Sequence, residues 1–263
     1  MFKNIILFAH KAGQKKHGVD KTPYFIKSLI NQNNNIFETK TSNDLFKNLN
    51  NLYLKNNSIN GPKVNIGGDH SMSIATVADS IARHKNLKLI WMDAHCDINT
   101  YEKSTSKNYH GMPLSFLTGL DKNDNFNFIK DNIKFKNILY LGIRDIDPFE
   151  QEVLEKYDIN FIPVSNINKD ISKTLIEIDN FIKDDPVHFS FDVDVLDPNI
   201  MPSTGTKVPN GVELKPCKII VDNMLKKNLV STDITELNLN IGNVKDRAKS
   251  LINLTYLFNN FID

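Results

Sequence analysis

The sequence lacks the features that mark secreted and membrane proteins. Among its 263 residues there are only two cysteines, Cys96 and Cys217, too few for a disulfide framework. No apolar run approaches the roughly 20 residues that cross a bilayer. The N-terminus also lacks the apolar core and small-residue cleavage site of a secretory signal. These absences predict a protein of the reducing cytoplasm with no membrane partner.

The sequence also lacks an excess of charge of one sign. It has 32 basic and 31 acidic side chains and no block of like charge. A nucleic-acid partner held by bulk electrostatics is therefore not expected, and a small molecule is the more natural ligand. A hydrophobic content of 40% over this length is enough for one core. We expect a single domain over residues 1–263.

Short apolar runs rich in β-branched residues recur along the chain, with helical patterns between them. This alternation favours a parallel sheet covered on both faces by helices. The predicted strands are residues 4–8, 64–66, 87–92, 137–141, 160–164, 187–191 and 229–234.

Helix signals occur between these runs. Thr22 supplies a cap and Pro23 a first-turn proline for a helix over 24–30. Apolar side chains between residues 74 and 81 fall on one helical face. Asparagine-rich stretches are expected to form turns and solvated loops at residues 32–35, 48–60 and 121–132.

Polar clusters follow three of the predicted strands. Parallel α/β sheets place their sites at the carboxyl ends of strands, so these clusters should meet. They are Gly67-Gly68-Asp69-His70-Ser71, Asp93-Ala94-His95-Cys96-Asp97, and Ser190-Phe191-Asp192-Val193-Asp194 followed by Leu196-Asp197-Pro198.

Within these clusters the acids and histidines alternate along the chain. An extended backbone would turn Asp93, His95 and Asp97 to one side, and likewise Asp192 and Asp194. With one further imidazole from the first cluster, four carboxylates and two imidazoles would repel and desolvate badly unless cations neutralised them. Two divalent metals are predicted. Mn²⁺ suits this ligand set best, and Co²⁺, Ni²⁺ or Zn²⁺ are possible substitutes.

Some of these residues have simpler interpretations. A single Asp at a strand end is usually a helix cap or turn residue, and we interpret Asp69 and Asp197 in this way. His70 alone could be a loop histidine. The six ligand-type residues taken together have no comparable structural explanation. Cys96 should point away from the metals and pack in the core.

The motifs GGDHS, DAHCD and SFDVDVLDP resemble the metal-binding signatures of the arginase and agmatinase family of ureohydrolases. The resemblance extends from about residue 11 to about residue 243. It implies a three-layer α/β/α fold with a mainly parallel sheet of about eight strands, a binuclear manganese centre and a homo-oligomer, commonly a trimer or hexamer. The implied metal ligands are His70, Asp93, His95, Asp97, Asp192 and Asp194.

The resemblance also implies a reaction. Two cations lower the pKa of a shared water, and the resulting hydroxide attacks the guanidinium carbon of L-arginine to give L-ornithine and urea. His110 matches the proton-shuttle histidine of the family and Glu236 its guanidinium-binding glutamate. With Asp97 they form the implied catalytic set. Thr206 lies in a matching loop and is expected near the substrate. A surface-loop histidine and a helix-start glutamate are the alternatives for the first two.

A further stretch resembles arginases specifically, and this resemblance implies which residues bind the amino-acid end of the substrate. Asn99, Ser106 and Asn108 are placed to bind the α-carboxylate, and Asp147 corresponds to the acid near the α-ammonium. Ordinary turn residues are the alternative for the first three. Their joint presence favours arginine over agmatine. Another ureohydrolase, acting on agmatine, guanidinobutyrate or formimidoylglutamate, and a noncatalytic metal-binding scaffold are the competing functions.

Overall fold

The computed structural model describes residues 4–262, and its centre is a parallel sheet. The eight strands lie in the order β2-β1-β3-β8-β7-β4-β5-β6, and every neighbouring pair is parallel. The strands are β1 Asn4–Phe8, β2 Asn35–Glu38, β3 Lys63–Gly67, β4 Lys88–Met92, β5 Ile138–Leu141, β6 Asn160–Ile162, β7 Val187–Asp192 and β8 Leu229–Thr235. The α-helices are α1 Thr22–Lys27, α2 Leu45–Asn57, α3 Ser73–Arg83, α4 Pro113–Thr118, α5 Pro148–Lys156, α6 Val164–Lys169, α7 Ile171–Ile182, α8 Leu214–Met224 and α9 Val244–Ile262.

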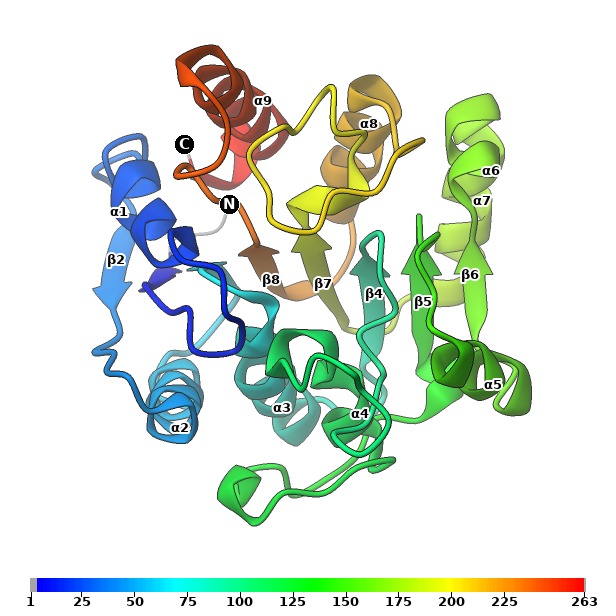
Figure 1. Cartoon of the computed structure of the whole chain (residues 1–263). Helices are drawn as coiled ribbons and strands as arrows, with labels where there is room; N and C mark the ends of the chain where they lie inside the picture. Colours follow the sequence, from blue (N-terminus) through cyan, green and yellow to red (C-terminus); the bar gives the residue numbers. More distant parts are fainter. Residues whose placement is uncertain (1–3, 263) are drawn as a thin grey trace.

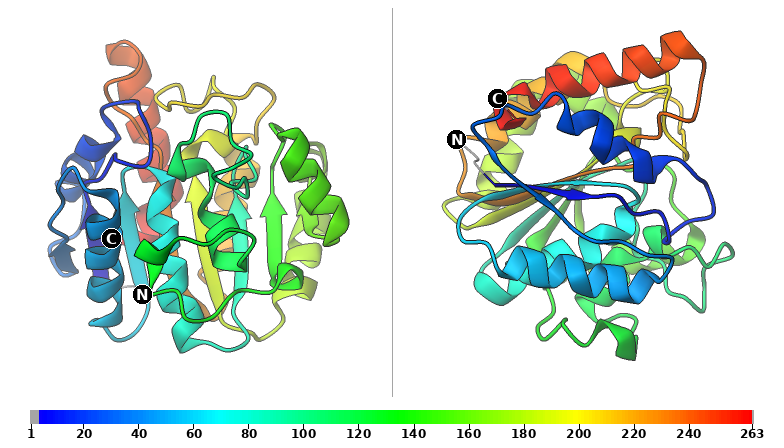
Figure 2. Two further views of the ribbon diagram at one scale, coloured as in Figure 1. Left: turned by 60° about the horizontal axis from the view of Figure 1, so that its bottom comes forward. Right: turned by 90° about the vertical axis from the view of Figure 1, so that its left-hand side faces the viewer.

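Helices cover both faces of the sheet, which makes three layers (Figures 1 and 2). One face is packed by α1, α6, α7, α8 and α9, and the other by α2, α3, α4 and α5. The alternation of side chains along each strand explains how one strand serves both layers. In β4, Ile90 and Met92 enter one core, while Leu89 and Trp91 enter the other. The predicted three-layer α/β/α fold with about eight mainly parallel strands is confirmed.

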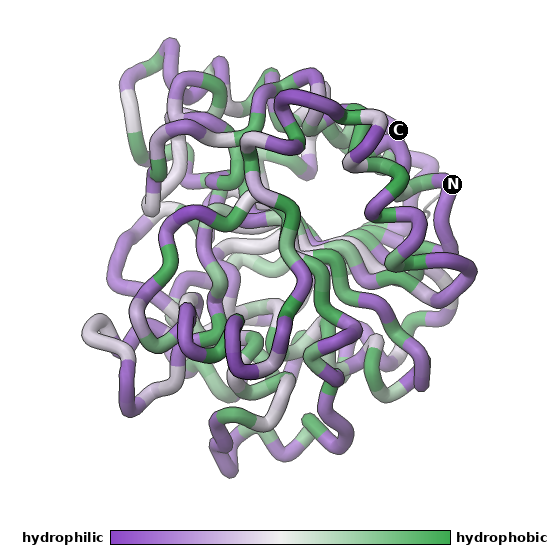
Figure 3. Tube along the Cα trace, turned by 90° about the vertical axis from the view of Figure 1, so that its right-hand side faces the viewer, coloured by the Kyte–Doolittle hydropathy of each residue, from purple (hydrophilic) through white to green (hydrophobic). Residues whose placement is uncertain are grey.

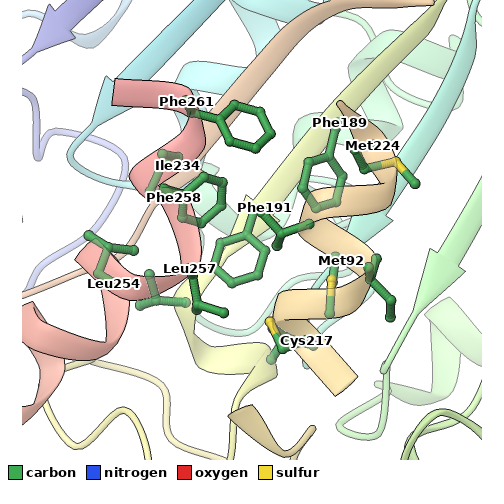
Figure 4. Packing of buried hydrophobic residues seen from close by; sticks show 14 of the residues in the cluster. Met92, Phe189, Phe191, Cys217, Met224, Ile234, Leu254, Leu257, Phe258 and Phe261 are labelled. Atoms are coloured by element: carbon green, nitrogen blue, oxygen red, sulfur yellow. The ribbon is translucent and has the colours of Figure 1, made fainter. Parts of the chain in front are cut away.

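Aromatic side chains fill much of the core between the sheet and the last helices (Figure 4). Phe191 on β7 meets Phe258 on α9 with ring centroids 5.0 Å apart, and Phe258 meets Phe261 at 5.2 Å. Hydrophobic residues are concentrated in the strands, whereas the outer loops are mainly hydrophilic (Figure 3). Over residues 4–262, no helix combines the length and apolar character that a membrane span requires.

The prediction for residues 48–60 was wrong, because most of this stretch belongs to α2. Its asparagines suggested a loop, yet Leu45, Leu49 and Leu52 recur at helical spacing and are buried. Asp44 caps the helix by accepting a hydrogen bond from the Lys47 amide at 3.0 Å. Asparagine has a weak helix propensity, and here the burial of a leucine face outweighs it.

Two smaller corrections concern the first part of the chain. Residues 32–34 form the predicted turn, but the edge strand β2, which begins at Asn35, was not predicted. Thr22 is the first residue of α1 rather than its cap, and its hydroxyl donates to the Leu237 carbonyl. Pro23 does lie in the first turn, and residues 121–132 are mostly loop, as predicted.

Candidate metal and substrate site

The ends of β3, β4 and β7 bring the first group of candidate ligands together. His70 follows β3, and its Nδ1 atom lies 3.0 Å from Asp93 Oδ2 and 3.0 Å from Asp97 Oδ2. The same atom lies 3.2 Å from Asp192 Oδ2. The imidazole is 1% exposed, and Nδ1 has no hydrogen-bond partner. A buried nitrogen facing three carboxylate oxygens is the arrangement expected of a cation site.

A second group of candidate ligands adjoins the first. His95 Nδ1 lies 3.1 Å from Asp194 Oδ2 and 3.4 Å from Asp93 Oδ1. One ligand atom each from His70, Asp93 and Asp97 lie within 4.8 Å of one another, and the same holds for Asp93, His95 and Asp194. Asp93 belongs to both groups, with one oxygen toward each histidine. The six side chains therefore offer two neighbouring metal sites joined by a shared carboxylate.

The pKa values of these groups show how much charge is crowded into the site. Burial, together with the charge of Asp93, raises the pKa of Asp97 to about 6. Burial alone would lower the pKa of His70, but the nearby carboxylates of Asp192, Asp93 and Asp97 raise it well above its usual value. Divalent cations would supply the same compensation without protons, because a metal replaces the proton on each ligand. The donor set fits a pair of such ions.

The local backbone differs from the prediction that extended alternation aims these residues. β4 ends at Met92, so Asp93 lies in a bend after the strand and His95 in an isolated bridge to Asp145. Asp97 has a φ of 50°, in the left-handed region that is unusual for a residue other than glycine. Asp194 lies in a short 3₁₀ turn after β7. Asp192 is the last residue of β7, and the other acids reach it because the chain bends at the sheet edge.

Glu236 lies beside the first metal group, just past the end of β8. It is 1% exposed and has a φ of 65°. Its Oε1 accepts a hydrogen bond from the His70 amide at 2.9 Å and lies 3.1 Å from His110 Nδ1. Gln14 Nε2 donates to both carboxylate oxygens, at 2.9 and 2.7 Å. The pKa of Glu236 is lowered despite burial, chiefly by its hydrogen bond with His110, so the site keeps a buried carboxylate.

A cavity of about 130 Å³ opens beside both metal groups. It brings together several of the residues predicted to bind substrate, while Glu236 and Asn108 are not among the residues that line it. Thr206 donates from Oγ1 to Asp194 Oδ2 at 2.7 Å, so it also contacts a candidate ligand. The lining residues from the substrate and catalytic predictions are Asp97, Asn99, Ser106, His110, Asp147 and Thr206.

Two of the residues predicted to bind substrate are joined by a hydrogen bond. Asn99 Nδ2 donates to Asp147 Oδ2 at 2.8 Å, while Asn99 Oδ1 is buried without a partner. Glu150 supports this pair, since its carboxylate accepts from the Asp147 and Ile98 amides at 3.1 and 3.2 Å. Burial raises the pKa of Glu150 to about 7. This corner of the cavity is therefore acidic and rigidly held.

Sequence reasoning missed Gln14, Ser104, Asp145 and Glu150, which contact Glu236 or line the cavity. Glu150 could have been found, because Asp-x-x-Glu with a first-turn proline is a capping-box pattern. Gln14 gave no signal, since its partner is 222 residues away.

The simpler interpretations of three residues are confirmed. Asp69 caps the short turn that begins at His70, accepting from the Ser71 amide at 3.1 Å. Asp197 accepts from the Asn199 amide at 2.9 Å, as a turn residue does. Cys96 is buried in the core.

The fold and the site together define an α/β protein with a histidine- and aspartate-lined metal site at the carboxyl edge of a parallel sheet. Residues 11–255 match the arginase family. The chain is 35% identical to an arginase of Entamoeba histolytica over 264 residues, with 89% of each protein covered. The chain belongs to the arginase family.

Two further comparisons place it within that family. It is 35% identical to the hepatic arginase of Aquarana catesbeiana over 198 residues, which cover 72% of this chain but only 61% of that protein. The match thus spans less than two thirds of that relative. The crystal structure of the Entamoeba histolytica arginase in complex with L-ornithine has a TM-score of 0.87, with 30% identity and 98% of both chains covered.

Proposed function

We propose that this protein is a two-metal arginase that hydrolyses L-arginine to L-ornithine and urea. The observation that carries the proposal is the unpartnered, buried His70 Nδ1 facing three carboxylates, with a second histidine group sharing Asp93. Similarity to the arginase of Entamoeba histolytica over 89% of both chains supports it, and L-ornithine is the ligand in that protein's crystal structure.

The metal pair would be held by His70, Asp93, Asp97 and Asp192 on one side and by Asp93, His95 and Asp194 on the other. When bound, two divalent ions would lower the pKa of a water molecule so that hydroxide is available near neutral pH. Mn²⁺ is the proposed ion, because oxygen ligands outnumber nitrogen ligands.

Glu236 would bind the guanidinium group, and His110 would protonate the amine that leaves it. A buried carboxylate offers two oxygens to the planar fork of N–H donors, which makes the guanidinium binding charge-assisted. Burial alone would lower the pKa of His110, but contact with Glu236 raises it to about 9. The imidazole is therefore protonated at neutral pH and can give a proton to the departing amine.

The other end of the cavity would select the amino-acid part of the substrate. Asp147 offers a carboxylate to the α-ammonium. Asn99 and Ser106 offer a second amide hydrogen and a hydroxyl to the α-carboxylate. A ligand without that carboxylate would leave these donors unpaired, which favours arginine over agmatine. A role for Asn108, a homo-oligomeric assembly and a cytoplasmic location remain predictions.

A substrate panel tests the proposal. Protein loaded with Mn²⁺ is expected to release urea from L-arginine much faster than from agmatine or guanidinobutyrate, and to leave formimidoylglutamate intact. Equal or inverted rates would point to another ureohydrolase. A protein that binds two Mn²⁺ but transforms none of these compounds would be a metal-binding scaffold.

A matched pair of variants separates metal binding from turnover. Glu236→Ala is expected to keep both ions and lose urea formation, whereas Asp97→Ala is expected to lose metal and activity together. Metal content is measured by atomic emission beside the urea assay. Full activity in the Glu236→Ala protein would rule out Glu236 as the guanidinium ligand.

A further inference from the structure

A chain of buried hydroxyl groups leads from His70 away from the metal site. His70 Nε2 lies 2.8 Å from Ser190 Oγ, on β7. Ser190 Oγ lies 3.3 Å from Ser73 Oγ, at the start of α3, and Ser73 Oγ donates to Asp233 Oδ2 at 2.8 Å, on β8. Each of these side chains is at most 1% exposed, so no bulk water competes with these contacts. The path joins the turn after β3, the strands β7 and β8 and the helix α3 beneath the site.

Asp233 is the end of this path and is held from several sides. Thr76 Oγ1 also donates to its Oδ2, and Asn65 Nδ2 donates to its Oδ1 at 3.0 Å. His188 Nε2 lies 3.1 Å from Oδ2. Burial would raise the pKa of Asp233, but the neighbouring His188 and the hydroxyl donors lower it. Asp233 therefore remains a carboxylate, which only accepts hydrogen bonds.

The direction of every hydrogen bond in the path follows from that carboxylate. Because Asp233 accepts the Ser73 proton, the Ser73 oxygen is free to accept the Ser190 proton. The Ser190 oxygen is then left to accept from His70 Nε2–H. A neutral imidazole with its proton on Nε2 has its lone pair on Nδ1, the atom that faces Asp93, Asp97 and Asp192.

We propose that Asp233 is a positioning residue of the metal centre, which fixes the tautomer and orientation of His70 through Ser73 and Ser190. Metal-binding histidines commonly donate their second N–H directly to a carboxylate. Here two serine hydroxyls extend that contact, so the controlling carboxylate lies one layer deeper, between β8 and α3. The inference rests on the proposed metal centre.

The effect should be confined to one of the two ions. His70 belongs only to the group with Asp93 and Asp97, whereas His95 belongs only to the group with Asp93 and Asp194. The second nitrogen of His95 lies 3.6 Å from Asp145 Oδ2, which is not part of the buried path. A general loss of protein stability would not selectively weaken the binding of one ion.

Ser73→Ala and Thr76→Val form a matched pair for the test. Both residues are on α3, both are fully buried, and both donate to the same oxygen of Asp233. Only Ser73 lies on the path to His70. The full-length proteins are titrated with Mn²⁺ by calorimetry. The fluorescence of Trp91 is followed in parallel, because this sole tryptophan stacks on His70 with centroids 4.2 Å apart.

Ser73→Ala is expected to weaken one of the two Mn²⁺ binding steps by about 10- to 100-fold, the range seen when such outer contacts are lost. The other step should be unchanged. Thr76→Val should bind both ions as the wild type does, although its metal-free unfolding midpoint falls as far as that of Ser73→Ala. Equal weakening of both steps, equal effects in the two variants, or unchanged binding in Ser73→Ala would overturn the proposal.

Ser190→Ala breaks the same path at the next contact and serves if Ser73→Ala does not fold. It should weaken the same step, and the double variant should be no weaker than either single variant, because one broken contact already interrupts the path. Additive losses would contradict the path. Failure of the wild type to bind two ions or to form urea refutes the proposed function, whereas wild-type behaviour of these variants refutes only the role of Asp233.

Discussion

His110 Nδ1 lies 3.1 Å from Glu236 Oε1, which pairs the candidate proton donor with the candidate guanidinium ligand before substrate arrives. The two residues are 126 positions apart in the sequence and meet at the edge of the sheet. Gln14 Nε2 donates to both oxygens of the same carboxylate. In the proposed reaction, a guanidinium group would have to share or replace these donors, which also stabilise the charge of Glu236 in the free protein.

Glu236→Gln should lower the pKa of His110. Burial lowers it, and the contact with Glu236 is the largest of the effects that raise it to about 9, so it should fall when this negative charge is removed. The pKa is measured by NMR titration of the metal-free protein, with His17→Gln used to identify an exposed histidine signal. A pKa still near 9 in the variant would show that other acids, such as Asp97, keep the pKa of His110 high.

The same pair makes stability depend on pH. The folded-state pKa of His110 lies above its unfolded value, so its contribution is complete below pH 6.5 and is lost as the pH rises through about 9. In metal-free protein, urea unfolding should show this decline for the wild type. It should be reduced in His110→Asn. Parallel curves for the two proteins would contradict the assignment.

Metal binding should release protons and weaken as the pH falls. Hydrogen bonds and charges from the surrounding aspartates outweigh burial and raise the pKa of both His70 and His95, so the metal-free imidazoles carry protons that Mn²⁺ must displace. Calorimetry in buffers of different ionisation enthalpy should report on the order of two protons released per metal pair at neutral pH. His95→Asn should release about one fewer. Binding that is independent of pH would contradict this account.

Asn99→Asp should impair arginine binding more than agmatine binding. The substitution places a second carboxylate 2.8 Å from Asp147, where Asn99 now donates a hydrogen bond, and the added charge repels the α-carboxylate of arginine. We expect KM for arginine to rise at least about tenfold, equivalent to about 1.4 kcal/mol. The reaction with agmatine, which has no carboxylate and is expected to be the slower substrate, should change less. Asn99→Ser serves as the uncharged control. Equal effects on both substrates would show that Asn99 does not lie near the α-carboxylate of arginine.

Strands and ligand clusters could be predicted because their signals are local. Alternation of apolar and polar residues, as in 187–191, is typical of strands, and the acids that follow such stretches stand at the place where parallel sheets carry their sites. The identity of the cluster residues therefore predicted a metal site. Their geometry could not be predicted, because it depends on a sharp turn at Asp97 that places this residue at positive φ.

Contacts between distant segments account for most of what was missed. Gln14 reaches Glu236 across 222 residues, and Ser73 reaches Asp233 across 160. Neither contact leaves a periodic or compositional trace in the sequence. The helix α2 was missed for a different reason, since the asparagine content concealed a leucine face that becomes decisive only when it packs on the sheet.

Phe258→Ala should destabilise the protein without removing the metal site. Phe258 is 1% exposed and packs between Phe191 and Phe261, so its loss should leave a cavity and cost about 3–5 kcal/mol of unfolding free energy. Tyr256→Ala, on the same helix but 47% exposed, should cost less than about 1 kcal/mol. Urea unfolding with bound Mn²⁺ measured in parallel checks both. Phe191 directly precedes the candidate ligand Asp192, so a marked loss of Mn²⁺ from folded Phe258→Ala would mean that aromatic packing, rather than the strand hydrogen bonds of β7, holds this ligand in place.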